Sequence, residues 1–475
     1  MNPRTRRNVL RGTTGVLVGA LVVAGWVTVE AIAVGVGHKA KMLCSGVFVS
    51  GRDPAAVLAE LQADDLAILQ YINASVDPGG QSATARAFGV LARRAVWRKG
   101  LGCALVLDRL RPPVLPAGHD GVIAPAGAGL VQGEPAASDE GAVTGAGELQ
   151  AAVVRAFSEP RPECRRRTLA VVVVHRGRIV AERYATGIGP DTPLAGWSMT
   201  KSVMNALTGI LVGQGRLTLD APVPIPEWQQ AGDPRASITL DHLLRMSSGL
   251  RFDEGMANPR SDVMRMLFAV GDAAGFALRK DLAFFPGTQW QYSSGTSNIL
   301  ARVLRNVLHD ETKYLTFPRR ALFDRLGMSS AVLETDAGGT FVGSSYMYAT
   351  ARDWARFGTL YLQDGMWNGE RVLPEGWVTY TTTPAPADST KRYGAHFWLQ
   401  VPDEYAGTDA HLPAPALHAA GHEGQLVTIV PSRELVLVRL GRTRYAGAWD
   451  HLAFVRQVLA AIDGVIGKGV SRTGG

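Results

Sequence analysis

Two apolar hairpins stand near opposite ends of one long stretch of this chain and constrain its fold more than any other feature. The first joins Thr168–His175, which contains four consecutive valines, to Ile179–Tyr184 across an Arg-Gly-Arg turn. The second joins Leu426–Pro431 to Glu434–Gly441 across a Ser-Arg turn. The run of β-branched residues in Thr168–His175 is too apolar for an edge strand, which predicts a strand in the interior of a sheet.

The residues around and between the hairpins predict helices. Residues 198–380 show mostly helical patterns that Pro and Gly interrupt, and further helices are expected at Glu148–Phe157 and Trp449–Ile462. The fold class is therefore α+β. Residues 148–465 are expected to form one antiparallel sheet from both ends of the region, with flanking helices and an inserted helical lobe. Residues 466–475 are expected to be a flexible tail.

Composition divides the segment that precedes this region. Residues 38–110 predict a small module with a helix around Ala55–Ile72 and a strand at each of two cysteines. Residues 111–147 are rich in Pro, Gly and Ala and predict a surface connection.

The N-terminus predicts export. Residues 1–11 contain four arginines and are followed by an apolar run at residues 12–37, whose one charged residue is Glu30. The length and composition of this run predict a transmembrane helix, with the arginines on the cytoplasmic side. The alternative is a cleaved signal peptide with Ala31-Ile32-Ala33 as the cleavage site. The protein is then either a single-pass inner (cytoplasmic) membrane protein whose body lies in the periplasm or outside the cell, or a secreted protein.

An exported chain can hold a disulfide, and this one has three cysteines, Cys44, Cys103 and Cys164. Cys44 and Cys103 each lie in an apolar, strand-like run, so they are the preferred pair, with Cys164 left free. The sequence alone leaves the other pairings open.

Charge and motifs exclude several classes of function. The formal net charge is +7, and residues 1–41 supply +5 of it through six basic residues against Glu30. The rest of the chain is close to neutral and gives no support for a nucleic-acid partner. Neither a CxxC nor an HExxH motif is present, so no metal ion or cofactor is expected.

The first chemical motif is Ser198-Met-Thr-Lys201, at the start of a helical pattern that follows a strand. A serine hydroxyl needs a base within hydrogen-bond reach to act as a nucleophile. Lys201 lies one helical turn from Ser198 and can be that base if burial lowers its pKa. The structural alternative is a helix-capping serine beside a solvated lysine, and the motif alone favours it.

Two further motifs carry groups of the same kind. Tyr292-Ser293-Ser294 lies on a short loop before a helix, where Tyr292 and Ser294 could relay a proton; a core tyrosine beside a cap is the alternative. His422-Glu423-Gly424-Gln425 enters the strand that begins at Leu426. Gly424 would let a substrate approach the strand edge, and the Gln425 N–H could bind an oxyanion. A lone histidine such as His422 is otherwise more often structural.

The three motifs together, in this order and spacing, resemble the serine β-lactamase and penicillin-binding-protein superfamily. The resemblance is closest to the branch related to class C β-lactamases, which includes esterases, D-aminopeptidases and 6-aminohexanoate-oligomer hydrolases. It covers about residues 148–463. Four stretches are typical of this branch: Trp197–Ser202, His242–Leu250, Tyr348–Trp354 and Gly421–Gln425.

The resemblance implies roles for the motif residues and a β-lactamase/transpeptidase-like fold. Ser198 would be the acylated nucleophile, Lys201 its general base and Tyr292 the group that protonates the leaving group. The N–H groups of Ser198 and Gln425 would form the oxyanion hole.

Two positions depart from the most familiar members of the superfamily. Ser294 stands where many relatives have asparagine, and His422-Glu423-Gly424 stands where β-lactamases have Lys-Thr-Gly. A mostly neutral histidine and an added carboxylate would bind the carboxylate of a β-lactam poorly. Small amides or esters are therefore the expected substrates.

The expected function is that of an exported, membrane-anchored serine hydrolase that cleaves amide or ester bonds of a small molecule through an acyl-enzyme. The first alternative is a D,D-peptidase or β-lactamase that acts on cell-wall peptides or β-lactams. The alternative of another class is a catalytically inactive, penicillin-binding-like sensor or binding module.

Overall fold

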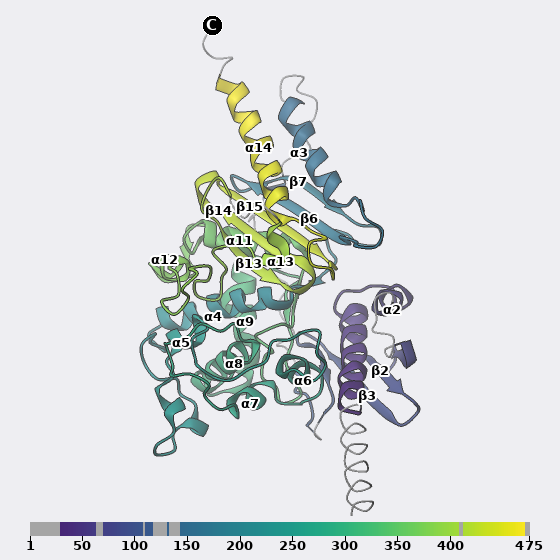
Figure 1. Ribbon diagram of the computed structural model, residues 1–475, viewed down its shortest axis with the longest axis vertical. Helices are drawn as coiled ribbons and strands as arrows, with labels where there is room; N and C mark the ends of the chain where they lie inside the picture. The colour runs from purple at the N-terminus through teal and green to yellow at the C-terminus, as the bar shows by residue number, and fades with distance from the viewer. Residues whose placement is uncertain are drawn as a thin grey trace, which may run out of the picture.

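The computed structural model describes residues 29–62, 70–107, 110–116, 131–132, 143–407 and 412–470. At its centre is a six-stranded sheet with the order β13-β14-β15-β6-β7-β5 (Figure 1). Its strands are β5 Val131–Gln132, β6 Thr168–His175, β7 Arg178–Tyr184, β13 Leu417–Gly421, β14 Gln425–Val430 and β15 Leu435–Gly441. Antiparallel pairing of β15 with β6 joins the two predicted hairpins into one sheet, whereas β5 runs parallel to β7.

Helices cover both faces of this sheet, in agreement with the expected flanking helices. The valines of β6 alternate between the two faces: Val171 and Val173 belong to one apolar core, and Val172 and Val174 to the other. On the first face α3 (Val143–Ala156) and α14 (His451–Val470) pack against each other. On the second face α11 (Ala351–Leu362) packs against β6, β14 and β15. Because α14 continues to Val470, half of the tail predicted at residues 466–475 is helical, and residues 471–475 lie outside the described part.

The segment between the hairpins forms the predicted helical lobe, most of which lies below the sheet in Figure 1. Its α-helices other than α11 are α4 Thr200–Gly213, α5 Leu240–Leu244, α6 Asp262–Phe268, α7 Ala273–Leu278, α8 Ser294–Leu308, α9 Glu311–Pro318, α10 Asp324–Leu326, α12 Trp377–Thr382 and α13 Asp403–Ala406. Its short strands are β8 Leu194–Ala195, β9 Val332–Leu333, β10 Met347–Ala349, β11 Met366–Trp367 and β12 Glu370–Arg371. Shorter helical turns are η2 Trp197–Met199, η3 Pro226–Trp228, η4 Pro234–Ser237, η5 Arg319–Phe323, η6 His422–Gly424 and η7 Pro431–Arg433.

The chain before the sheet forms a small module beside the lobe (Figure 1). It consists of a helix at residues 29–48, α2 Pro54–Gln62, and a four-stranded antiparallel sheet of β1 Ile72–Asp77, β2 Ser82–Ala87, β3 Leu91–Arg98 and β4 Gly102–Leu105. The predicted helix at Ala55–Ile72 is therefore shorter than expected, since Ile72 already begins a strand. Most of the predicted connection at residues 111–147 lies outside the described residues.

The predicted disulfide between Cys44 and Cys103 is present, and Cys164 is free. Cys103 lies in β4 as expected, but the expectation of a strand at Cys44 is wrong, because Cys44 lies in the helix at residues 29–48. That helix is buried between the small sheet and the lobe, so it is apolar on more than one side. A short apolar run fits a buried helix as well as a buried strand, and periodicity alone does not separate them.

The transmembrane helix predicted at residues 12–37 finds no support in the structure. Residues 12–28 lie outside the described part, and residues 29–37 belong to the helix that packs against the lobe. Gly37 approaches the backbone of Phe268 closely, and the His38 ring meets the Phe268 ring edge-on at 4.9 Å. Among the described residues, no helix has the length and apolar character that crossing a membrane requires.

Candidate active site

Ser198 lies on the turn η2, between strand β8 and helix α4, as the strand-to-helix motif predicts. The residue before it, Trp197, has a φ of 48°, which a tryptophan rarely adopts. This strained turn is held on both sides. The Gly196 N–H donates to the Met347 carbonyl at 2.8 Å, and a Cβ at Gly196 would lie 2.4 Å from the Trp354 ring. Backbone strain of this kind persists where the surroundings enforce it and is common at catalytic sites.

Lys201 is buried on α4 and points at the serine. Its Nζ donates to Ser198 Oγ at 3.0 Å, to Ser294 Oγ at 3.1 Å and to the Ser344 carbonyl at 3.0 Å. Burial lowers the pKa of Lys201 to about 8, and the Glu254 carboxylate partly opposes this effect. A solvated lysine beside a capping serine, the structural alternative, is therefore not what the structure shows. A lysine with this pKa is neutral for much of the time near pH 8 and can accept a proton.

Tyr292 meets the same two residues from the loop before α8. The Tyr292 ring centroid lies 4.8 Å from Lys201 Nζ, and the interaction with Ser198 partly opposes the effect of burial on the pKa of Tyr292. Burial raises the pKa of Tyr292, so the phenol keeps its proton at neutral pH. The structure therefore brings Ser198, Lys201 and Tyr292 together, and their catalytic roles stay predictions.

Ser294 connects this group to Glu254, a residue that the sequence did not single out. The Ser294 hydroxyl donates to Glu254 Oε2 at 3.0 Å, and the Ser294 N–H donates to Glu254 Oε1. Burial raises the pKa of Glu254, while Lys201 opposes this rise. Glu254 lies in a loop next to a second acid, Asp253. Nothing in the surrounding sequence indicates that Glu254 is partly buried while Asp253 is exposed to solvent.

The His422-Glu423-Gly424 segment forms the turn η6 between β13 and β14, and β14 begins at Gln425, one residue before the predicted start. Gly421, directly before the turn, approaches the nucleophile: a Cβ there would lie 2.2 Å from Gly196 O and 3.1 Å from Ser198 N. The His422 ring meets the Trp197 ring edge-on at 5.6 Å. Strand β13 is thus pressed against the turn that carries Ser198.

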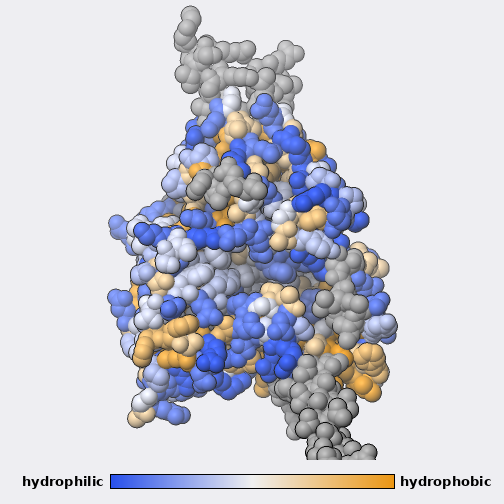
Figure 2. Space-filling view, viewed as in Figure 1, coloured by the Kyte–Doolittle hydropathy of each residue, from blue (hydrophilic) through white to orange (hydrophobic). Residues whose placement is uncertain are grey.

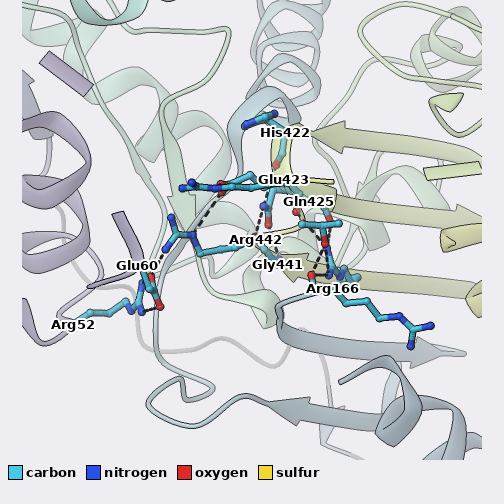
Figure 3. Close-up of polar contacts among 12 residues, drawn as sticks. Arg52, Glu60, Arg166, His422, Glu423, Gln425, Gly441 and Arg442 are labelled. Carbon is cyan, nitrogen blue, oxygen red and sulfur yellow. Dashed lines mark hydrogen bonds and ion pairs between the residues drawn. The ribbon is translucent and has the colours of Figure 1, made fainter. Parts of the chain in front are cut away.

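Gly424 and Gln425 face the interior of this segment. A Cβ at Gly424 would lie 2.3 Å from Arg439 Nη1, so the glycine makes room for an arginine, a reason that differs from the predicted approach of substrate. The Gln425 side chain donates to the carbonyls of His422 at 3.0 Å and Gly441 at 2.6 Å (Figure 3). These bonds hold the turn, and the role of the Gln425 N–H in an oxyanion hole stays a prediction.

Glu423 is buried, and its charge is compensated by arginines. Its Oε1 accepts from Arg444 Nε at 2.9 Å, and its Oε2 lies 3.8 Å from Arg442 Nε. Burial would raise the pKa of Glu423, but Arg442, His422 and Arg444 together lower it. The expectation that Glu423 adds negative charge to the substrate site is therefore wrong, because the carboxylate is turned to these two arginines (Figure 3).

An open cavity of about 540 Å³ lies beside the catalytic group. Trp290 and Trp398 line it, and Trp398 stacks on Tyr292 with ring centroids 5.5 Å apart. The polar part of its lining includes Arg392, Asp388 and Asp403. Indole faces next to Tyr292 offer an apolar wall on which an elongated substrate could lie. Among the residues the structure describes, no group of three or more His, Cys, Asp or Glu could hold a metal ion.

Comparison with known proteins identifies the family of the region that contains this site. Residues 151–460 match the family model described as Beta-lactamase. The 6-aminohexanoate-dimer hydrolase of Paenarthrobacter ureafaciens is 27% identical over 227 residues, which are 44% of this chain and 56% of that protein. The alignment thus spans little more than half of that hydrolase's length.

Two further comparisons, one of sequence and one of structure, cover most of the length of the other protein. An uncharacterized protein of Alkalihalophilus pseudofirmus is 21% identical over 301 residues, 57% of this chain and 82% of that protein. The solved structure of EstCE1, a hydrolase with promiscuous acyltransferase activity, superposes with a TM-score of 0.51 at 15% identity. That superposition covers 68% of this chain and 99% of EstCE1 and supports the fold.

Proposed function

Since this chain belongs to the β-lactamase family and is a serine hydrolase, we propose that it cleaves linear amide or ester bonds of small molecules through an acyl-enzyme on Ser198. The observation that carries the proposal is the convergence of Ser198, Lys201 and Tyr292, with Lys201 buried at a pKa of about 8. A nucleophile, a base that can be neutral and a protonated phenol are the groups that acyl transfer requires.

In the proposed reaction, Lys201 Nζ takes the proton of Ser198 while Ser198 Oγ attacks the substrate carbonyl. The oxyanion of the tetrahedral intermediate is bound by the Ser198 N–H and by a second N–H from the segment between Gly421 and Gln425. The carbonyl–heteroatom bond then breaks, and Tyr292 donates a proton to the leaving amine or alcohol, with Lys201 returning a proton to Tyr292. Water activated by the same base hydrolyses the ester on Ser198.

Two features support linear amides or esters over β-lactams. The His422-Glu423-Gly424 turn replaces Lys-Thr-Gly, and Glu423 is bound to Arg442 and Arg444, so the turn offers no lysine to a β-lactam carboxylate. The cavity of about 540 Å³ that Trp398 lines adjoins Tyr292, on which Trp398 stacks, and could take a chain-like leaving group. A 6-aminohexanoate-dimer hydrolase is among the relatives.

The test is a fluorophosphonate probe followed by a substrate panel of p-nitrophenyl esters, linear amide oligomers, D-amino-acid peptides and nitrocefin. Wild-type protein should be labelled at Ser198 and Ser198→Ala should not. Turnover of linear amides or esters supports the proposal, and turnover confined to nitrocefin or D-amino-acid peptides assigns the protein to the β-lactamase or D,D-peptidase class instead. Absence of both labelling and turnover would assign it to the class of inactive binding modules.

We further propose that the protein is exported. Because residues 29–37 pack against the lobe, the apolar residues 12–28 would act as the inner-membrane anchor, or as part of a signal segment if the protein is secreted. The disulfide between Cys44 and Cys103 supports export, because disulfides persist in oxidising compartments. The arginines before the apolar run support the orientation with the body outside.

A further inference from the structure

The turn that carries His422 and Glu423 needs external support to hold its shape. Glu423 has a φ of 62°, in the left-handed region that residues with a side chain rarely occupy. The turn nevertheless presses Gly421 and His422 against the backbone and ring of the residues around Ser198. A shift of this turn would therefore change the position of Ser198 directly.

Part of the support comes from the catalytic region itself. The Glu423 carbonyl accepts from the Thr443 N–H at 2.9 Å, and the Gly424 carbonyl accepts from Arg439 Nη1 at 2.9 Å. The Gly424 N–H donates to the Tyr405 hydroxyl at 2.9 Å. These bonds bind the backbone of the turn, whereas the Glu423 side chain is bound by Arg442 and Arg444.

Arg442 is bound in turn by the N-terminal module. Its Nη1 donates to Glu60 Oε2 at 2.7 Å, and Glu60, on α2, also accepts from Arg52 Nη1 at 2.8 Å (Figure 3). Burial would raise the pKa of Glu60, but Arg52 and Arg442 together lower it, so Glu60 is charged at neutral pH. A continuous series of ion pairs thus runs from Arg52 of the module through Glu60 and Arg442 to Glu423.

We propose that the N-terminal module is a positioning element of the active site, in which Glu60 fixes Arg442 and thereby holds Glu423 and the turn η6 against Ser198. The inference rests on the proposed hydrolase function for its kinetic consequences, but not for its structural ones. Arg442 binds Glu60 on the module and Glu423 on the turn. Without Glu60 its side chain is free to leave Glu423, because Glu60 is the one module carboxylate that binds it among the described residues. The reacting groups of the site all lie on the catalytic region, and the module helps to hold the turn η6 in position beside them.

The kinetic test compares Glu60→Gln with a matched control, Glu30→Gln. Glu30 also joins the module to the lobe, through Arg265 at 2.8 Å, but its ion pair does not reach the turn η6. Glu60→Gln should lower kcat for a p-nitrophenyl ester about tenfold, as expected when a catalytic group is misplaced by a fraction of an ångström, with KM changing less. Glu60→Asp, which keeps the charge, should recover part of the loss, and Glu30→Gln should retain the wild-type kcat.

The structural test is amide hydrogen exchange of residues 420–425 in the full-length protein, which requires no activity. Exchange in this segment should be faster in Glu60→Gln than in the wild type and unchanged in Glu30→Gln. Unchanged exchange and unchanged kcat in Glu60→Gln would overturn the proposal. Equal acceleration in both variants would also overturn it, since that outcome reports a general loosening of the module. If the wild type proves inactive on every substrate, the hydrolase proposal fails while the exchange measurement still decides this one.

Discussion

Lys201 is the residue on which the chemistry depends most, and its charge state can be tested directly. The pKa of Lys201 is lowered to about 8 by burial, so activity should rise with pH through about 8 as the neutral amine forms. Lys201→Arg keeps a positive charge that cannot be lost at working pH, and it should abolish acylation of Ser198. Fluorophosphonate labelling across pH 6–10 checks both statements. Appreciable labelling of Lys201→Arg would assign the base to another group, with His422 the next candidate.

The same burial has a consequence for stability. The unfolded chain holds the Lys201 proton up to about pH 10.5, whereas the folded protein releases it near 8. Stability should therefore increase as pH rises from about 8 to 10.5, by on the order of 3 kcal/mol from this group. Lys201→Met removes the buried charge and should be inactive without being less stable at pH 7. Urea denaturation of both proteins at pH 7 and pH 10 measures the difference.

Glu254 should tune Lys201 from the far side of Ser294. Its carboxylate raises the pKa of Lys201, so Glu254→Gln should lower that pKa further and shift the rise of activity to lower pH. The neighbouring exposed acid provides the control: Asp253→Asn should leave the midpoint in place. A shift of the midpoint to higher pH in Glu254→Gln would contradict this account of the site.

At the scale of elements, the approach of β13 to the turn η2 depends on Gly421. A Cβ at this position would lie 2.2 Å from Gly196 O, in a part of the chain where neither strand nor turn has space to move. Gly421→Ala should cost about 1–3 kcal/mol of stability and should reduce activity by a larger factor than stability explains. Gly464→Ala, in α14 with nothing within 4 Å, is the control and should be neutral or stabilising. Thermal melts and ester turnover of the two variants distinguish them.

The sequence predicts those elements whose evidence is local. The valines of β6 and the three-residue spacing of Ser198 and Lys201 are visible over a few residues, and both the sheet and the base were predicted from them. The helix that contains Cys44 was not predicted. Its apolar residues are explained by its burial between the small sheet and the lobe, which are far apart in the sequence. The roles of Glu254 and Arg442 could not be predicted from their neighbours in the sequence either. Glu254 acts through Ser294, which lies 40 residues away in the chain, and Arg442 acts through Glu60 of the N-terminal module.

The whole molecule should be sensitive to acid through its buried histidines. Burial lowers the pKa of His38 to about 4 and those of His396 and His418 to about 3, and it lowers that of His451. These groups are neutral when folded and take up protons on unfolding below about pH 6.5, so stability is lost as pH falls through that value. Each should cost about 2 kcal/mol between pH 6.5 and 5. Denaturant titrations at pH 7 and pH 5 measure the sum, and equal midpoints would contradict it.

Export and the disulfide can be examined on the intact protein. Thiol labelling of denatured protein from the envelope fraction should find one free cysteine, Cys164. Reduction, or Cys103→Ser, should lower stability by roughly 2–5 kcal/mol, because the crosslink closes a long loop that ties the helix at residues 29–48 to β4. Three labelled thiols in the native preparation would argue against an oxidising compartment.

Surface chemistry at this scale agrees with a body that faces water. Figure 2 shows one face of the molecule as mainly hydrophilic, with apolar side chains in separate patches. Most of the large apolar residues of the described part are instead gathered in the two cores on either side of the sheet and in the module, although some, such as Phe88 and Phe285, are exposed.

The pairing of β15 with β6 also governs when this protein can become active during synthesis. Strand β6 leaves the ribosome more than 250 residues before β15, so it must wait without its neighbour while the whole lobe is made. Contacts between such distant segments close slowly. Until then the edge of β6 that β15 will occupy is open, which makes this strand of four valines a site for aggregation. Nascent chains that stop before Gly441 should therefore have Ser198 and Lys201 but no reactivity toward the probe. Chaperone demand during expression should fall when the C-terminal hairpin is supplied early, as in a circular permutant that begins with it.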